Sequence, residues 1–237
     1  MQPETIEKLI TPKTKALMIN TPNNPTGSVM DEETMRQIAE IAVKHDILVI
    51  SDDVYNTLLY DGAKNTCIAA FPGMKERTAV VNSLSKSYAM TGWRIGFVAG
   101  PAELVSAMTK CQENFNACAN APGQYAGTVA LAHPELCEEL RKVFENRRRL
   151  LLDGLKGIKG IESNDPKGAF YVFADISGFG LSSADFCNRL LDEQKVVCIP
   201  GSAFGACGEG FIRIAYTCSD SDLVEAVARI KAFCESL

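Results

Sequence analysis

Apolar residues occur along the chain in short blocks that predict strands alternating with helices. Two apolar runs, residues 16–20 and 47–51, have the length and composition of buried strands. Between them, residues 31–46 carry apolar side chains at the helical spacing, and Asp31 is suited to cap the first turn. A strand, a helix and a second strand in this order form a βαβ unit, which predicts a parallel sheet.

The pattern continues to the C-terminus with further strands and helices. Residues 94–99 return to the sheet after a short connection, so this strand is a candidate for antiparallel pairing. We place helix N-caps at Ser182 and Ser219, each followed by acidic residues in the first turn. The other expected strands are 78–82, 168–176, 196–200 and 210–216, and the other helices are 101–114, one beginning near 124, 135–155, 182–194 and 219–237.

The charged helix expected at 135–155 predicts a division into two domains. It is amphipathic and long enough to connect them, and the order of elements changes beyond it. We therefore expect a large α/β domain at residues 1–147 and a small α/β domain at residues 148–237.

The composition is that of an ordinary globular protein and argues against several classes of partner. Of 237 residues, 46% are hydrophobic and 22% are charged, and the formal net charge is -5. The basic triplet at residues 147–149 lies in a Glu-rich helix, so we interpret it as a solvated face and expect no nucleic-acid partner. No apolar run reaches about 18 residues, so we expect no membrane span. Residues 1–15 lack the apolar core of a secretory signal.

Cysteine and histidine usage gives no support for disulfides or metal. The nine cysteines form no CxxC pair, their number is odd, and several lie in apolar runs. We interpret them as reduced, small hydrophobic residues of a cytoplasmic protein. His45 and His133 are the two histidines and lie far from any cysteine pair, so we expect no metal site.

Four polar segments interrupt the apolar framework. Three of them follow the C-terminal ends of predicted strands, where ligands bind in open α/β sheets. The fourth opens a strand, so the turn after Lys86 would bring Arg94 to the same edge. The segments are Asn23–Gly27, Ser51–Tyr55, Ser83–Lys86 and Thr91–Gly96.

Each segment has an ordinary explanation when taken alone. NNPTG is a good turn sequence, an acidic pair can cap a loop, and a lysine in a Ser-rich loop is most often a surface residue. The combination is more informative than its parts. It consists of an amide, an acid and a phenol three residues apart, a lysine, and an arginine eight residues after that lysine.

This combination resembles the aminotransferase class I family, whose members are pyridoxal 5′-phosphate (PLP) enzymes. The matching segments are NPTG at 24–27, SDDVY at 51–55, SLSKSYAMTGWRIGF at 83–97, PGSAFG at 200–205 and FIRIAY at 211–216. The S-x-S-K-x7-R-x-G pattern is highly specific, and GWRIGF and GSAFG are similar to the bacterial aspartate/aromatic-type branch. The resemblance implies PLP-dependent transferase fold type I, with a mainly parallel sheet in the large domain.

The resemblance also implies roles for residues that would hold the cofactor ring. Lys86 would bond covalently to the PLP aldehyde and later move a proton at the substrate Cα. Asp52 would accept a hydrogen bond from the pyridine N–H and keep that nitrogen protonated. Tyr55 and Asn24 would both donate to the 3′ oxygen, and Asn24 would also line the substrate position.

Phosphate and substrate have their own implied residues. Ser83 and Arg94 would bind the PLP phosphate, with Ser85 as a further hydroxyl donor. Arg213 would bind the substrate α-carboxylate and so orient the bond to be broken. Asp53 stands where many relatives have glutamate, and we expect it to support the loop.

The implied activity is amino transfer between an amino acid and a 2-oxo acid. Two alternatives stay open: a PLP-dependent C–S β-lyase or decarboxylase on the same fold, and a shortened chain without activity. Relatives place the active site at a homodimer interface, with the segment equivalent to 116–124 reaching the partner subunit. Relatives also carry a large segment before the equivalent of Thr11, so we expect this chain to be part of a longer protein or a shortened form of one.

Overall fold

The computed structural model describes residues 2–237, which form two compact units. The first unit contains the chain up to Pro22 together with Val29–Leu140, and the second contains Asn23–Ser28 together with Arg141–Leu237. The expected division after residue 147 lies within the long helix α6 (Glu135–Leu155) and stays a prediction. Among the described residues, none of the helices has the length and hydropathy needed to cross a membrane.

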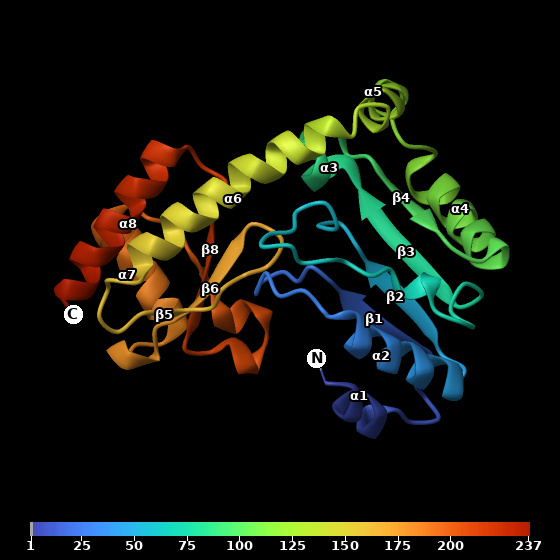
Figure 1. Ribbon diagram of the computed structural model, residues 1–237, viewed down its shortest axis with the longest axis horizontal. Coiled ribbons are helices and arrows are strands. Elements are labelled where there is room, and N and C mark those ends of the chain that lie inside the picture. Colours follow the sequence, from blue (N-terminus) through green and yellow to red (C-terminus); the bar gives the residue numbers. More distant parts are fainter. Residues whose placement is uncertain (1) are drawn as a thin grey trace. The chain divides into compact units, whose positions relative to one another are not determined.

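The first unit is built on a four-stranded sheet in the order β1-β2-β3-β4 (Figure 1). Strands β1 to β3 pair in parallel, and β4 pairs antiparallel with β3. This confirms the predicted βαβ unit, the mainly parallel sheet and the reversed last strand. The bounds are β1 Ala16–Asn20, β2 Leu48–Asp52, β3 Thr78–Ser83 and β4 Gly96–Ala99.

One face of this sheet is covered by α2 (Glu32–Lys44). Asp31 caps the helix as predicted, because its carboxylate accepts a hydrogen bond from Thr34 N at 2.7 Å. The apolar side of α2 packs into the core that also contains Ile19 and Val49. The alternate residues of the strands face the other way, and that face is open: Met18 is 63% exposed, and Leu48 and Ile50 are also exposed.

The other helices of the first unit differ from expectation at α1, α3 and α5, and the four-residue α3 was not predicted. A short helix, α1, was not predicted, because seven residues carry too little periodicity. Helix α5 begins at Ala121, not near residue 124, because Asn120 caps it through Gly123 N and Pro122 is tolerated in a first turn. The bounds are α1 Pro3–Leu9, α3 Leu84–Ser87, α4 Ala102–Asn116 and α5 Ala121–Leu131, with short 3-10 turns at Ile68–Ala70 and Thr91–Trp93.

The second unit is an antiparallel sheet in the order β5-β6-β8-β7 with three helices. The predicted strand at 196–200 shortens to two residues, and the two-residue β5 was not predicted. The strands are β5 Glu162–Ser163, β6 Tyr171–Asp175, β7 Ile199–Pro200 and β8 Phe211–Ala215. The helices are α6, α7 Ser183–Gln194 and α8 Asp220–Glu235, with 3-10 turns at Ser177–Phe179, Gly201–Phe204 and Ala206–Gly208.

Aromatic and aliphatic side chains form the core of the second unit. Phe186 of α7 and Phe233 of α8 are fully buried, with ring centroids 5.1 Å apart. The predicted N-caps are confirmed, since Ser182 accepts from Asp185 N and Ser219 accepts from Asp222 N. The solvated-face interpretation of the triplet at 147–149 is wrong for its middle residue. Arg148 is only 4% exposed and pairs with Asp165, so a tertiary contact has overridden the pattern.

Candidate active site

The predicted cofactor residues of the first unit meet at one edge of its sheet. In the strand register, Asn20 of β1 lies beside Asp52 of β2, and Asp52 lies beside Val81 of β3. Ser83 ends β3 and pairs with Gly96, which opens β4. The strand register thus brings Asp52, Ser83 and Gly96 to one sheet edge, while the Asn23–Gly27 segment belongs to the second unit, and the roles of the site residues stay predictions.

Asp52 and Asp53 are adjacent but differ in environment. Asp52 is half-buried, its side chain accepts from Val54 N at 3.3 Å, and its carbonyl accepts from the Asn20 amide at 3.1 Å. Asp53 is buried and accepts from Ser51 Oγ at 2.6 Å. Burial, with a smaller contribution from the Asp52 charge, raises the pKa of Asp53, although the Ser51 bond opposes this shift. Asp52 is therefore the more accessible acid, and Asp53 belongs to the interior.

Ser83 organises the turn that carries Lys86. Its Oγ accepts from Ser85 N at 3.0 Å as the N-cap of α3, and it donates to Ile95 O at 3.0 Å. Ser85 Oγ lies 2.8 Å from Ser83 Oγ, so two hydroxyls lie side by side just before the half-buried Lys86. A hydrogen bond to Cys137, together with burial, raises the pKa of Tyr88 to about 12, so Tyr88 stays a neutral phenol near this lysine.

Arg94 adopts a backbone conformation that few non-glycine residues adopt. Its φ is 56° and its ψ is 45°, in the left-handed region, which costs roughly 1–2 kcal/mol for an L-residue. Its Nη1 donates to Thr91 O at 2.9 Å, and the preceding carbonyl, Trp93 O, accepts from Asn120 Nδ2 at 2.8 Å. Local strain of this kind is concentrated at functional sites. The strained turn presents an exposed guanidinium two residues before β4.

Of the remaining predicted residues, Tyr55 is buried in the first unit, and Asn24 and Arg213 lie together in the second unit. Arg213 Nη1 donates to Asn24 Oδ1 at 2.8 Å. Two rings flank the same guanidinium, with its Cζ 4.4 Å from the centroid of Tyr171 and 5.0 Å from that of Phe204. Within the described residues, Nε of Arg213 is buried and has no hydrogen-bond partner. A donor left unsatisfied in this way is the kind of atom that an anionic ligand would satisfy.

The loop that carries Asn24 is held from the side of residues 164–168. Asn164 Nδ2 donates to Thr26 O, and Gly168 N donates to Gly27 O at 2.9 Å. Gly27 has a φ of 65°, and a Cβ added to it would lie 2.3 Å from Cβ of Pro166. Only glycine fits this close approach, which explains the turn sequence NNPTG physically.

Sequence reasoning missed the residues that support this second cluster. Tyr171 lies in the strand expected at 168–176 without a predicted site role, and Phe204 and Asn164 have no predicted role either. The PGSAFG segment was noted without a contact for its phenylalanine. The signal existed in part, because an aromatic residue and an arginine near the chain end are a natural cation–π pair. Their pairing nevertheless depends on the antiparallel register of β6 and β8.

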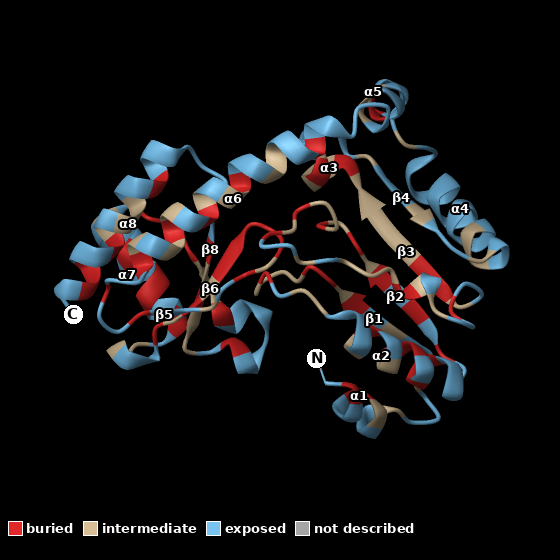
Figure 2. Ribbon diagram, viewed as in Figure 1, coloured by how far each residue is buried: buried red, intermediate tan, exposed pale blue. Residues whose placement is uncertain are grey.

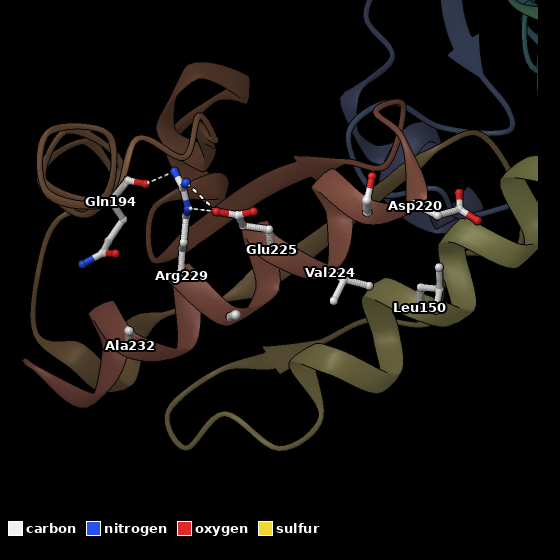
Figure 3. A pocket seen from close by; sticks show the side chains of 9 residues that line it. Leu150, Gln194, Asp220, Val224, Glu225, Arg229 and Ala232 are labelled. Carbon is white, nitrogen blue, oxygen red and sulfur yellow. Dashed lines mark hydrogen bonds and ion pairs between the residues drawn. The ribbon is translucent and has the colours of Figure 1, made fainter.

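A surface depression of the second unit is lined by none of these residues. Figure 3 shows it along α8, with Leu150 of α6 and Gln194 of α7 at its sides. Its volume is about 880 Å³. The one arginine in it, Arg229, is occupied, since it donates to Glu225 Oε1 at 2.6 Å and to Gln194 O at 3.0 Å. This groove contains none of the predicted site residues.

The site chemistry fits PLP. A carboxylate suits a pyridine N–H, a guanidinium and two hydroxyls suit a phosphate, and a half-buried amine suits an aldehyde. The buried, unpartnered Nε of Arg213 suits a carboxylate. An α/β protein with the carboxylate, the hydroxyls and the amine at one sheet edge has the features of a PLP-dependent transferase of fold type I.

Comparison with known proteins shows the family. The family model described as aminotransferase class I and II matches residues 1–230, and the chain belongs to this family. It is 45% identical over 231 residues to aromatic-amino-acid aminotransferase 2 of Thermococcus litoralis, covering 96% of this chain and 59% of the relative. It is also 45% identical over 231 residues to aspartate aminotransferase of Pyrococcus abyssi, with the same coverage.

Solved structures agree with the fold. The aromatic aminotransferase from Pyrococcus horikoshii superposes with a TM-score of 0.96 at 41% identity, covering 100% of this chain and 64% of that one. The Thermus thermophilus aspartate aminotransferase solved with maleate gives 0.92 at 36% identity, covering 100% and 60%. The chain thus spans about three-fifths of the length of its curated relatives. Enzymes of this family use PLP as cofactor.

Proposed function

We propose that this protein is a PLP-dependent aminotransferase that moves an amino group between an amino acid and a 2-oxo acid. The observation that carries the proposal is the gathering of Asp52, Ser83 and the Lys86 turn at one sheet edge. Family membership and the names of the relatives support the same activity.

Four residues would act on the cofactor ring and the reacting carbon. PLP, when bound, supplies an aldehyde and an electron-accepting ring. Lys86 would hold the cofactor through that aldehyde and would move the proton at the substrate Cα. Asp52 would keep the pyridine nitrogen protonated, because its carboxylate is half-buried and already accepts a hydrogen bond. Tyr55 and Asn24 would donate to the 3′ oxygen, and Asn24 could do so through its amide nitrogen because its oxygen already accepts from Arg213.

Phosphate and substrate carboxylate are held by fixed positive groups and hydroxyls. Arg94, Ser83 and Ser85 would bind the phosphate, with the left-handed turn fixing the arginine backbone. Arg213 binds the substrate α-carboxylate, a role that its unpartnered Nε and flanking rings support. Asn24 lies beside it as the second substrate-binding residue.

A labelled-nitrogen experiment tests the activity. The chain is incubated with PLP, a panel of ¹⁵N-labelled amino acids and an unlabelled 2-oxo acid, and the label is followed by mass spectrometry. Amino transfer predicts ¹⁵N in the amino acid formed from the 2-oxo acid, and loss of this transfer in Lys86→Ala. Release of CO₂ or of a thiol without ¹⁵N transfer would instead identify a decarboxylase or a C–S β-lyase. The absence of all three products would contradict the proposal for this chain.

The assembly proposed is a homodimer. Helices α4 and α5 leave large apolar side chains in solvent, and Figure 2 shows α4 exposed along most of its length. Phe115 is 84% exposed and Tyr125 is 77% exposed, with Met108 and Val129 also exposed. Apolar surface of this kind is typical of an interaction face. Sedimentation tests the proposal, and an enzyme that is active as a strict monomer would contradict it.

The segment expected to approach the partner is shorter than the sequence indicated. The expected loop 116–124 is reduced to residues 117–120, because α4 continues to Asn116 and α5 begins at Ala121.

We propose a cytoplasmic role in amino acid biosynthesis, which the nine free cysteines support because free thiols persist in reducing compartments.

A further inference from the structure

Glu209 ties two separate turns of the second unit together. Its Oε1 accepts from the backbone N–H of Ser183 at 2.7 Å, and its Oε2 accepts from Ser183 Oγ at 2.9 Å. Ser183 is fully buried at the first turn of α7, so these are the acceptors for a hydroxyl that water does not reach. The two backbone and side-chain bonds from Ser183 lower the pKa of Glu209, which is therefore a carboxylate at neutral pH.

The same serine reaches the turn at 201–204. Ser183 Oγ and Ser202 Oγ are 3.0 Å apart, and Ser202 N lies 3.4 Å from Ser183 Oγ. A serine hydroxyl has one proton, and a carboxylate can only accept. Ser183 Oγ lies within donor reach of both Glu209 Oε2 and Ser202 Oγ, so its one proton is shared between these two acceptors. The carboxylate and the turn at 201–204 therefore meet at the same buried hydroxyl.

The turn itself is closed at its base by two glycines. A Cβ on Gly201 would lie 2.0 Å from Gly208 O, and a Cβ on Gly208 would lie 2.1 Å from Gly201 O. The backbones therefore touch, and residues 201–208 form a compact loop anchored at one point. Glu209 follows directly after the closure, and Ser202 directly after its start.

Phe204 is the side chain that this loop presents to the substrate-binding arginine. Its ring centroid lies 5.0 Å from Cζ of Arg213 and 6.2 Å from the ring of Phe173. One residue separates it from Ser202 within the same 3-10 turn, so a shift of Ser202 moves the ring. Within the described residues, the guanidinium donates to Asn24 and lies between two rings, so its orientation also depends on those rings.

We propose that Glu209 is a positioning residue for Arg213, acting through Ser183 and Ser202 on the turn that presents Phe204. The ring then holds the guanidinium in the orientation that a substrate carboxylate meets. The orientation toward a substrate carboxylate rests on the proposed function of Arg213. The effect of Glu209 on Phe204 and on the guanidinium concerns only the protein and needs no substrate.

The test uses the full 237-residue chain and the NMR signal of the Arg213 Nε–H group. Arg213→Lys assigns the signal, and Phe204→Leu gives the direction in which it moves when the ring is lost. Glu209→Gln keeps the size but replaces an acceptor by a donor, so the signal should move in the Phe204→Leu direction. Glu225→Gln is the control, since Glu225 is an exposed glutamate paired with Arg229 on α8.

A titration with succinate, followed on the same signal, provides the second readout. We expect Glu209→Gln to bind succinate roughly three- to tenfold more weakly, the effect of losing about one hydrogen bond. Glu225→Gln should bind as the unaltered protein does. If succinate does not bind the unaltered chain, the proposed function of Arg213 fails, while the shift of the Nε–H signal still decides the positioning role.

A purely structural role predicts a different result. Glu209→Gln would then lower the melting temperature but leave the Arg213 signal and succinate binding unchanged, which would overturn the proposal. Should that variant not fold, Ser202→Ala removes the hydroxyl contact between Ser183 and the turn, keeps the longer backbone contact from Ser202 N, and leaves the Ser183–Glu209 contact intact. A shifted Arg213 signal in Ser202→Ala supports the proposal, and an unshifted one overturns it.

Discussion

Arg213 and Asn24 are 189 positions apart in sequence, yet Nη1 of the arginine donates to Oδ1 of the asparagine at 2.8 Å. The bond fixes the asparagine amide so that its oxygen faces the arginine. It also leaves the amide nitrogen as the group that donates elsewhere. A single contact thus orients both residues of the proposed substrate-binding pair.

Removing the asparagine should loosen the arginine. We predict that Asn24→Ala weakens binding of a 2-oxo acid by roughly three- to tenfold, because the guanidinium loses its side-chain acceptor. Isothermal titration measures this directly. Asn114→Ala, in exposed α4, is the control, because its amide bonds only to Lys110 O within its own helix. Equal affinities in the two variants would show that Asn24 does not orient Arg213.

Gly27 and Gly62 allow backbone strain to be separated from steric overlap. Both have a positive φ, but a Cβ on Gly27 would lie 2.3 Å from Pro166 Cβ, whereas a Cβ on Gly62 meets nothing within 4 Å. We predict that Gly62→Ala lowers the free energy of unfolding by about 1–2 kcal/mol. Gly27→Ala should lower it by roughly 3 kcal/mol or more, because the loop must also move. Urea unfolding of both variants measures the difference, and similar losses would contradict the close approach.

The buried Asp53 should make stability depend on pH. Its raised pKa, due first to burial and then to the Asp52 charge, means that the folded state binds this proton more tightly than the unfolded state. The stabilisation is complete below the ordinary aspartate pKa of about 4 and is lost as pH rises through the raised value. We predict that Asp53→Asn gains stability relative to the unaltered protein between about pH 4 and pH 7.

Chemical denaturation across that pH range measures the effect. Asp153→Asn, which alters an exposed aspartate of α6, is the control. It shows how the free energy of unfolding changes with pH when an ordinary surface aspartate is replaced. A constant difference between Asp53→Asn and the unaltered protein at every pH would contradict a raised pKa. The hydrogen bond from Ser51 Oγ remains possible in the variant, since an asparagine oxygen also accepts.

Local patterns predicted most of the fold because the deciding forces are local. The apolar run at 16–20 became β1 with the same bounds, and the charged helix at 135–155 became α6 with the same bounds. Asp31, Ser182 and Ser219 cap helices as their side-chain chemistry requires. The strand at 196–200 shortened because only Ile199 and Pro200 pair with β8, and pairing is a tertiary property.

The sequence could predict the site only where its residues follow the ends of strands. The sheet edge collected Asp52 and the Lys86 turn as predicted, since carboxyl ends of parallel strands meet there. The residues that position Arg213 could not be predicted from the sequence, because Glu209 acts through Ser183, a residue 26 positions earlier. The burial of Arg148 was hidden for the same reason, since its partner Asp165 comes from a separate loop.

Covalent labelling of Lys86 tests the central claim most directly. The chain is treated with PLP and then with borohydride, and the modified peptide is identified by mass spectrometry. The account predicts a single major adduct on Lys86, which Lys86→Ala abolishes and which Lys75→Ala, at an exposed lysine of the same unit, leaves unchanged. An adduct of the same yield in Lys86→Ala, or a major adduct on another lysine, would contradict the assignment of Lys86 as the lysine that binds the cofactor.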